Sequence, residues 1–426
     1  MTGVRKLGSA NAMIGFMPDS PASRHPAVFL PLFAPFGISN GYVTVTLAFL
    51  LARAGLSTLQ ITTIIAATLW AQTWKALWAP IVDTVGNPKL WYGLGATGIG
   101  VTIVAMSLLP ATEGSIAAIT VLAVLSSVSS TLNSMSSEIF LAQCVPPALH
   151  GRASGWAQAG SLGGSGLGGG LGLLLAEHFT QQWIAGAALA AICFACWGFV
   201  RLLPPANRSH RTHSYLQDLK AVARDVWQVA RSRVGYLALI LMMLPIASGA
   251  APWSAIASEW GAGAELVAWV NGIGGGLASA LGALAVGYVC DRLSPGRAYC
   301  VFGLAAGVIA VVMAWSARTP LAFTVFTLAY SAAIGCGFAA YSAIVLRAIG
   351  QRSAATNFNL MAALSNMPIA LMTTFDGWVH DRYGTDAMLY GELALPAATI
   401  VAFALLVVAT RRLGTGSQSP GPGVLR

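Results

Sequence analysis

The chain has 426 residues, of which 56% are hydrophobic and only 9% are charged, and its formal net charge is +9. An ordinary globular protein has about 25% charged residues, so these charges are too few to coat a water-soluble surface of this size. The composition therefore excludes a soluble globular protein and indicates a surface that mostly faces lipid.

Residues 1–26 contain no apolar core long enough for a secretory signal, and we expect a cytoplasmic tail. A helix needs about 20 apolar residues to cross a bilayer, and no alternating pattern of a β-barrel occurs. The sequence therefore predicts an all-α polytopic membrane protein with twelve transmembrane helices. The expected spans are 27–52, 59–80, 90–110, 115–143, 153–177, 182–203, 234–258, 264–289, 298–316, 320–346, 353–378 and 388–410.

One long polar connection follows the sixth span and divides the chain near its middle. Its second part has apolar residues at helical spacing, which predicts an amphipathic helix on the inner leaflet. The expected organisation is an N-terminal six-helix bundle over 27–203, a cytoplasmic linker over 204–232, a C-terminal six-helix bundle over 233–410 and a cytoplasmic tail over 411–426.

The two halves resemble each other in sequence. Helix two ends WKALWAPIVD with Asp83 and helix eight ends ALAVGYVCDR with Asp291, an offset of 208 residues. A similar offset aligns Gly172, at the end of helix five's glycine run, with Gly377 in helix eleven. Such matches indicate duplication, and we expect two pseudo-symmetric bundles.

Lysine and arginine predict the orientation. With the N-terminus inside, 19 of the 23 basic residues are cytoplasmic, while Arg53, Arg318 and Arg382 lie outside and Lys75 lies within a span. We therefore expect both termini in the cytoplasm. The positive charge is explained by topology and requires no nucleic-acid partner.

Lys75 is a lysine inside a predicted span. Such a residue costs roughly 2.5–3.5 kcal/mol on insertion scales, so it usually has a partner or a wet cavity. It lies eight residues before Asp83, and Glu138 of helix four lies eight residues before Pro146, so both are about 12 Å from the same helix ends. We expect Lys75 and Glu138 to face each other as a charge pair that changes with proton or substrate occupancy. The alternative is that Lys75 extends to the interface and Glu138 forms a structural hydrogen bond.

Aromatic and amide side chains within the spans are candidates for the substrate pathway. Trp70 and Trp74 recur at helical spacing and either stack on a flat substrate or face lipid. The amides either bridge helices or line the cavity. Those amides are Asn133, Asn271, Asn359 and Asn366.

Three further polar residues, Asp376, His380 and Glu392, lie near the predicted outer face. They are either proton acceptors that face outside or solvated helix ends, and we expect solvated helix ends.

A short motif follows helix eight. Gly287-x-x-x-Asp291-Arg292-x-x-x-x-Arg297 places an acid at a helix end, where it can pair with arginine or cap a neighbouring helix. Contacts of this kind can form in one conformation and break in another, which a gate requires. The candidate cytoplasmic gate consists of Asp83, Arg152, Asp291, Arg292 and Arg297.

No motif indicates catalysis. The sequence has no Walker motif, no HExxH and no nucleophile elbow, so we expect no enzyme activity and no cofactor. The membrane region also lacks the clustered Asp, His and Cys that a bare metal ion would need.

The segment WKALWAPIVD, with Lys75, Trp78, Pro80 and Asp83, resembles the helix-two signature of the AmpG-type muropeptide permease and acetyl-CoA transporter branch of the major facilitator superfamily. The stretch from Asn133 to Arg152 is similar to that branch as well. Within it, the chain most resembles permeases of pyochelin, rhizobactin and yersiniabactin siderophore clusters. This resemblance implies the major facilitator fold and a monomeric inner-membrane importer of a metal–siderophore chelate, or of its iron or zinc.

The predicted mechanism is alternating access around a central site, without ATP, driven by protons through Glu138 and Lys75. A permease for muropeptide or another small organic solute, or a siderophore exporter, has the same fold. A non-transporting membrane sensor is a further alternative, but the chain has only short tails and the 204–232 linker for a soluble output domain.

Overall fold

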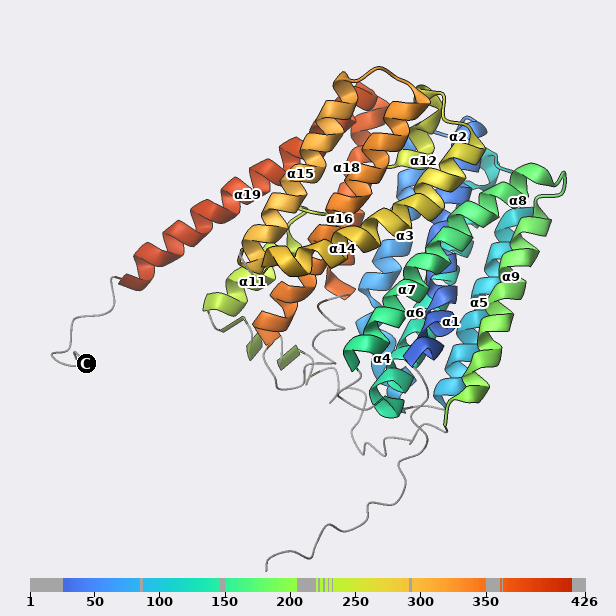
Figure 1. The fold of residues 1–426 in the computed structure, drawn as a ribbon, viewed down its shortest axis with the longest axis horizontal. Coiled ribbons are helices and arrows are strands. Elements are labelled where there is room, and N and C mark those ends of the chain that lie inside the picture. The colour runs from blue at the N-terminus through green and yellow to red at the C-terminus, as the bar shows by residue number, and fades with distance from the viewer. Residues whose placement is uncertain are drawn as a thin grey trace, which may run out of the picture.

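The computed structural model describes residues 26–84, 87–145, 150–204, 220, 223–224, 227–228, 230–231, 233–290, 293–349, 361 and 363–415. All regular secondary structure in these residues is helical (Figure 1). Nine helical runs in this part of the chain are long and apolar enough to cross a membrane. This confirms the predicted all-α polytopic membrane fold. The nine runs are Pro26–Arg53, Pro88–Leu108, Glu113–Leu141, Gly155–His178, Trp183–Leu202, Ala264–Val286, Pro295–Trp315, Pro320–Val345 and Thr385–Thr410.

The first six predicted spans correspond to consecutive helical runs of the N-terminal half. Helix one is η1 (Pro26–Val28), α1 (Phe29–Gly41), η2 (Tyr42–Leu47) and α2 (Ala48–Arg53), and helix two is α3 (Thr58–Thr73) and α4 (Lys75–Thr84). Helix three is α5 (Pro88–Leu108), and helix four is η3 (Glu113–Ser115) with α6 (Ile116–Cys144). Helix five is α7 (His150–Gly166), η5 (Leu167–Leu171) and α8 (Gly172–His178). Helix six is α9 (Trp183–Gly198) with η6 (Phe199–Leu202).

The C-terminal half supplies the other six. Helix seven is α11 (Arg233–Met243), α12 (Trp253–Ile256) and η7 (Ala257–Trp260), and helix eight is α13 (Ala264–Val267), η8 (Ala268–Gly274) and α14 (Gly275–Cys290). Helices nine to twelve are α15 (Pro295–Trp315), α16 (Pro320–Ile349), α18 (Asn366–Tyr383) and α19 (Thr385–Thr415). Most of the predicted amphipathic helix in 204–232 lies outside the described residues.

Two predicted spans are interrupted. The span 234–258 is not one helix, because α11 ends at Met243 and α12 begins at Trp253. Pro245 and Pro252 lack the N–H group that a helix interior needs, and Gly249 has a left-handed φ of 66°. The span 59–80 is also divided, since Trp74 leaves the helical conformation between α3 and α4.

Packing within each half follows the same scheme. In the N-terminal half α5 packs on α6 and α9, and α3 packs on α6. In the C-terminal half α15 packs on α16 and α19, and α14 packs on α16. Two contacts join the halves: α3 of helix two packs on α18 of helix eleven, and η5 of helix five packs on η8 of helix eight. If helix two corresponds to helix eight and helix five to helix eleven, each of these contacts is the symmetry equivalent of the other. The duplication inferred from sequence offsets is therefore present as pseudo-symmetry.

Glycines let helix five lie directly against helix one. A Cβ added to Gly160, Gly164 or Gly168 would lie 2.1–2.2 Å from a carbonyl oxygen of helix one. At the other face, a Cβ on Gly272 of helix eight would lie 2.6 Å from the backbone nitrogen of Gly170. The glycine run of helix five therefore fixes its contacts with both helix one and the opposite half.

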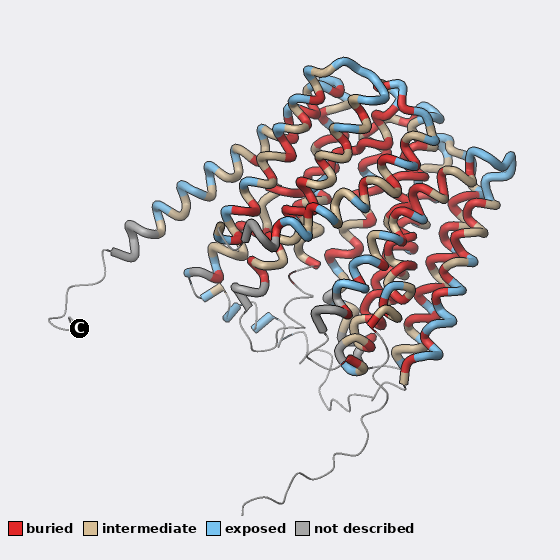
Figure 2. Tube along the Cα trace, viewed as in Figure 1, coloured by how far each residue is buried: buried red, intermediate tan, exposed pale blue. Residues whose placement is uncertain are grey.

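The largest apolar core spans both halves. It joins Val45, Phe49 and Leu173 from the N-terminal half to a larger group from the C-terminal half. Buried residues concentrate along the inner faces of the helices, and exposed ones along the outer faces (Figure 2). The C-terminal members include Trp253, Trp260, Val267, Phe323, Tyr330, Val379 and Met388.

Candidate functional site

The helical bundle has two ends, the Arg318 end and the Lys89 end. The Arg318 end contains the helix termini near Arg53, Glu177, Glu259, Arg318 and Asp381. The Lys89 end is the opposite one, where α4 ends and α5 begins. Lys89 there donates a hydrogen bond from Nζ to the carbonyl oxygen of Leu203, 2.7 Å away.

Lys75 and Glu138 face each other between helices two and four. The Nζ atom of Lys75 lies 3.9 Å from Oε1 of Glu138, and the two side chains are 15% and 27% exposed. Lys75 is the first residue of α4, directly after the interruption at Trp74. The ion pair is therefore mostly buried within the bundle, but it is not fully covered by protein.

Hydroxyl groups hold helix two on helix four on both sides of this interruption. Trp78 donates from Nε1 to Thr131 at 3.1 Å, and Ser127 donates to the carbonyl oxygen of Thr68 at 2.8 Å. Because these contacts fix α3 and α4 separately, the position of Lys75 relative to α6 is constrained.

The other predicted pathway residues are dispersed. Trp74 is 53% exposed, while Trp70 is half-buried. Asn133 is fully buried where α6 packs against Gly95 of α5. Asn271 donates to Ser254 at 2.9 Å and bridges helices eight and seven.

Asn366, another of the predicted amides, lies at the start of α18. Asn366 donates to the carbonyl oxygen of Ala363 at 3.3 Å, within its own helix start. Asn359 lies outside the described residues.

A polar pair that sequence reasoning missed lies beside Lys75 in the chain. Gln72 of α3 donates from Nε2 to Oδ1 of Asn40 in α1, at 2.8 Å. Asn40 is partly exposed. Its position in the middle of helix one was the available signal, because an amide within an apolar span needs a partner.

Most of the predicted gate at the Lys89 end cannot be placed. The side chains of Asp83 and Arg152, and all of Asp291 and Arg292, lie outside the described residues. Arg297 is described, and it is exposed near the start of α15. The gate stays a prediction.

The Arg318 end contains a network of charged groups. Arg318 pairs with Glu259 and, at 2.7 Å, with Oδ1 of Asp386, and its guanidinium lies 4.9 Å from the centre of the Trp260 ring. Glu259 also accepts a hydrogen bond from Thr385. The network joins the termini of helices seven, nine, ten and twelve of the same half.

Asp381 extends this network to the other half. Its Oδ1 and Oδ2 atoms each accept a backbone hydrogen bond at 3.1 Å, from Thr58 and Leu59 at the start of α3. His380, the preceding residue, lies 3.4 Å from Glu259. A carboxylate at a helix N-terminus satisfies free N–H groups and complements the helix dipole. Asp381 thus connects α18 to α3 and closes the two halves on each other at the Arg318 end.

Glu259 lies in η7, one residue beyond the end of the expected span 234–258. Burial alone raises the pKa of Glu259, but the hydrogen bonds from His380 and Thr385 and the charge of Arg318 outweigh it and lower the pKa. The carboxylate therefore stays ionised and anchors the network.

Asp376 and Glu392 contradict the expectation of solvated helix ends. Asp376 is 0% exposed and Glu392 is 3% exposed. Tyr330 donates a hydrogen bond to Oε2 of Glu392 at 2.6 Å. Counting residues from a helix end gave the right depth, but it could not show that α15, α16 and α18 cover these side chains.

A cavity of about 20 Å³ lies inside the N-terminal half, between helices one, three, four, five and six. Its walls include Tyr42, Thr46, Met106 and Ser107. A cavity of this volume holds about one water molecule, so it does not accommodate an organic solute. Within the described part of the chain, no three His, Cys, Asp or Glu side chains gather as metal ligands would.

Several solved structures share this fold. The nucleoside transporter NupG superposes with a TM-score of 0.66 at 13% identity, over 89% of this chain and 98% of that chain. A bacterial homolog of the human lysosomal transporter Spinster, inward-facing and unoccupied, has a TM-score of 0.66 at 14% identity, over 95% and 100%. The xylose transporter XylE from E. coli, partially occluded and inward-open, has a TM-score of 0.65 at 11% identity, over 90% and 97%.

A search of curated proteins found no match to the chain. The sequence profile of the Major Facilitator Superfamily matches residues 29–248, which is more than half of the 426 residues. Together with the two pseudo-symmetric halves, this profile shows that the chain belongs to the Major Facilitator Superfamily of membrane transporters.

Proposed function

We propose that this protein is a secondary active transporter that imports a small organic solute together with protons. The observation that carries the proposal is the Lys75–Glu138 pair, with 3.9 Å between charged atoms, at a partly exposed position within helices two and four. A lysine and a glutamate at this depth cost free energy of membrane insertion, and residues of this kind usually bind a substrate or an ion.

The pair supplies a mechanism for coupling. While Lys75 is nearby, Glu138 is held as a carboxylate. A solute that engages Lys75 removes this stabilisation, and Glu138 then takes up a proton because an ionised group in a low-dielectric site needs a counter-charge. Release of the solute restores the ion pair and expels the proton.

The orientation follows from the basic residues. With the positive-inside rule, the Lys89 end is cytoplasmic and the Arg318 end faces outward, in a bacterial inner membrane with both termini inside. The contacts of Asp381 with α3, and of Gly170 with Gly272, then close the outer side. This arrangement is the inward-facing or occluded member of an alternating-access pair.

The proposed cargo is a metal–siderophore chelate, and the carrier acts as a monomer. The resemblance of WKALWAPIVD and of the Asn133–Arg152 stretch to siderophore-cluster permeases supports this cargo class. A flat aromatic chelate suits Trp70 and Trp74, with Asn40 and Gln72 as nearby hydrogen-bonding groups. The metal travels already chelated, as substrate.

Transport in oriented membrane vesicles tests the proposal. Uptake of a radiolabelled metal–siderophore complex is compared in right-side-out and inside-out vesicles, with and without an imposed proton gradient. We expect accumulation in right-side-out vesicles whose lumen is alkaline. Accumulation only in inside-out vesicles makes the protein an exporter, and uptake of a muropeptide instead of the chelate changes the cargo. Gradient-independent uptake contradicts proton coupling.

A further inference from the structure

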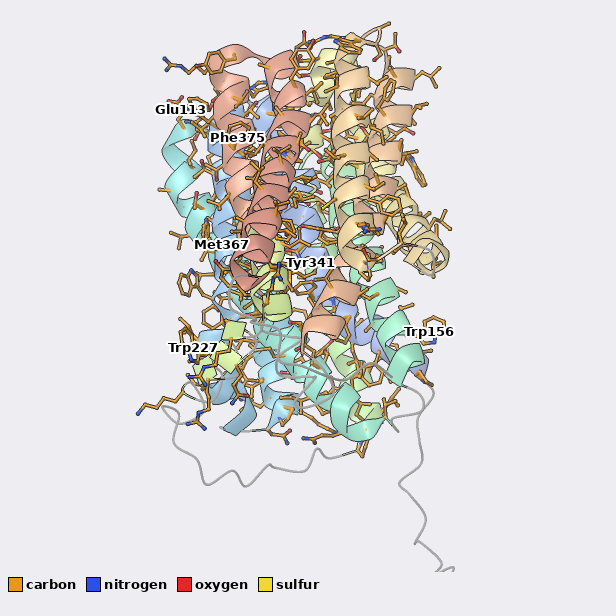
Figure 3. The ribbon with its side chains drawn as sticks, turned by 90° about the vertical axis from the view of Figure 1, so that its left-hand side faces the viewer. Glu113, Trp156, Trp227, Tyr341, Met367 and Phe375 are labelled. Carbon is orange, nitrogen blue, oxygen red and sulfur yellow. The ribbon has the colours of Figure 1, made fainter. Side chains whose placement is uncertain are left out.

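A second pair of ionisable groups lies inside the C-terminal half, in the hairpin formed by α18 and α19. Gly384, with a φ of 85°, makes the turn between these helices. Asp376 lies seven residues before the end of α18 and Glu392 seven residues after the start of α19, so both are about 10 Å below the Arg318 end. Phe375, next to Asp376, lies well above Met367 along this helix in Figure 3.

Close backbone packing seals the two side chains. A Cβ on Gly391 would lie 3.1 Å from the ring of Phe375, so α18 and α19 touch beside the pair. A Cβ on Gly307 of α15 would lie 2.6 Å from the carbonyl oxygen of Glu392, and one on Gly377 would lie 1.9 Å from Oγ1 of Thr62 in α3. The residues adjacent to both carboxyl groups are therefore in contact with neighbouring helices.

The hydrogen bonds of the pair are incomplete. Oε2 of Glu392 accepts from the Tyr330 hydroxyl at 2.6 Å. Oε1 of Glu392 and both oxygens of Asp376 are buried without a hydrogen-bond donor. A hydrogen bond between the two carboxyl groups would satisfy two of these atoms, but it requires a proton that two carboxylates do not have.

No base in the described part of the chain compensates these acids. Neither carboxyl group forms an ion pair with an arginine, lysine or histidine there. Helix α3 has no acidic or basic residue between Thr58 and Thr73, and α16 presents the hydroxyl of Tyr330. Arg297, Tyr299 and Cys300 of α15 lie in its first two turns, ten to seven residues before Gly307. Nearer the Arg318 end, Glu259, Arg318, His380, Asp381 and Asp386 bond to one another. Arg53 pairs there with Glu177, and Arg382 lies over the ring of Tyr383.

We propose that Asp376 and Glu392 form a proton-binding site that holds one proton while the Arg318 end is closed. The proton adds to the Asp376 carboxylate, and the resulting O–H donates to Oε1 of Glu392. Glu392 then accepts two hydrogen bonds, one from Asp376 and one from Tyr330, and a single negative charge remains. Two carboxylates this close cannot both stay ionised without a counter-charge, so the shared proton is the ligand that the geometry requires.

The site is connected to the contacts between the halves. Tyr330 packs edge-on against Trp253 of α12 with ring centroids 5.0 Å apart, and α12 contacts α2 of the N-terminal half. Asp376 precedes Gly377, which presses on α3. Opening the Arg318 end would separate α18 from α3 and expose the pair to water, where the proton can leave. In the transport cycle, this role rests on the proposed function, but the proton site itself does not.

The test measures proton binding through stability and requires no cargo. The thermal unfolding midpoint of purified protein in detergent is followed from acidic to alkaline pH by tryptophan fluorescence. Wild type is compared with Asp376→Asn and Glu392→Gln, each of which imitates a neutral acid. A folded state that binds one proton more than the unfolded chain loses stability as pH rises. We expect the midpoint of wild type to fall with rising pH, and that of both variants to fall less.

The exposed acid Glu265 provides the matched control, because Glu265→Gln removes a carboxylate outside the pair and should reproduce the wild-type slope. A wild-type slope equal to that of both variants overturns the proposal. So does a failure of both Asp376→Asn and Glu392→Gln to fold, or a lower stability of both at alkaline pH, because each variant keeps one carboxylate and either result shows that both charges are required. A midpoint that responds to sodium concentration and not to pH assigns the site to a metal cation and overturns it as well.

Discussion

Lys75 with Glu138 and Asp376 with Glu392 are two pairs of ionisable groups inside one bundle, and they are stabilised in opposite ways. The first pair combines a base with an acid, 3.9 Å apart, with 15% and 27% of the side chains exposed. The second combines two acids that are 0% and 3% exposed, with one hydroxyl donor. An acid beside a base can remain charged, whereas an acid beside an acid must take a proton. The two halves share a fold but not the chemistry of their buried charges.

Removing one member of the Lys75–Glu138 pair should have the largest effect. Lys75→Met and Glu138→Gln should each lower uptake more than tenfold, a factor that corresponds to about 1.4 kcal/mol, since the remaining charge loses its partner. Uptake and membrane protein levels are measured together. Lys220→Met and Glu113→Gln, at exposed positions, serve as matched controls. Wild-type uptake by both pair variants would separate this pair from transport.

Tyr330→Phe tests how the second pair, Asp376 and Glu392, is stabilised. The change removes the hydroxyl that donates to Glu392 at 2.6 Å and leaves a buried acceptor without a donor. We expect a loss of about 1–3 kcal/mol of unfolding free energy, and a larger loss at alkaline pH. Thermal unfolding measures both quantities, with the exposed Tyr236→Phe as control. Unchanged stability at every pH would show that the hydroxyl is not needed to hold Glu392.

Asp381→Asn tests whether closure of the Arg318 end is an electrostatic contact. The variant loses the charge that complements α3 and should cost about 0.5–1 kcal/mol of this contact. The readout is the alkylation rate of a cysteine introduced by Thr58→Cys, in a background without native cysteines, because Thr58 is buried under the contact. We expect faster alkylation with Asp381→Asn, and no change with Glu265→Gln. Equal rates for all variants would contradict the role of the cap.

Substitution of Glu259 should have the smallest effect on stability, and that effect should depend on pH only in the acidic range. Its lowered pKa means that it stabilises the folded protein at pH values above 4.5, its ordinary pKa, and that this stabilisation is lost as pH falls through the lowered value. Glu259→Gln should remove this acid-dependent part of the thermal unfolding midpoint. Identical acid profiles for wild type and variant would show that the network around Arg318 contributes nothing to stability.

Sequence reasoning located the first pair and missed the second for the same reason. Counting residues from helix ends gives depth, and equal depth placed Lys75 opposite Glu138. Depth also placed Asp376 and Glu392 near an end, but their burial depends on glycine contacts such as Gly307 with helix twelve, which one sequence does not display. The contact of Asp381 with α3 joins residues more than 320 positions apart, beyond any local pattern.

One of the two helix interruptions has a signal in the sequence and the other has none. The expected span 234–258 was wrong as a single helix, although Pro245 and Pro252 were an available signal of the break between α11 and α12, because proline cannot donate within a helix. The break at Trp74 has no comparable residue at that position. The spans themselves were predictable, because lipid imposes length and apolarity on every crossing helix.

Proton movement in proteoliposomes tests the central claim, that Glu138 and Lys75 couple protons to solute, most directly. A pH-sensitive dye inside the liposomes reports the lumen while a metal–siderophore chelate is added outside. Wild-type protein should acidify the lumen in step with uptake, and Glu138→Gln should abolish that acidification. Chelate uptake by wild type without acidification, or acidification that survives in Glu138→Gln, would contradict the account.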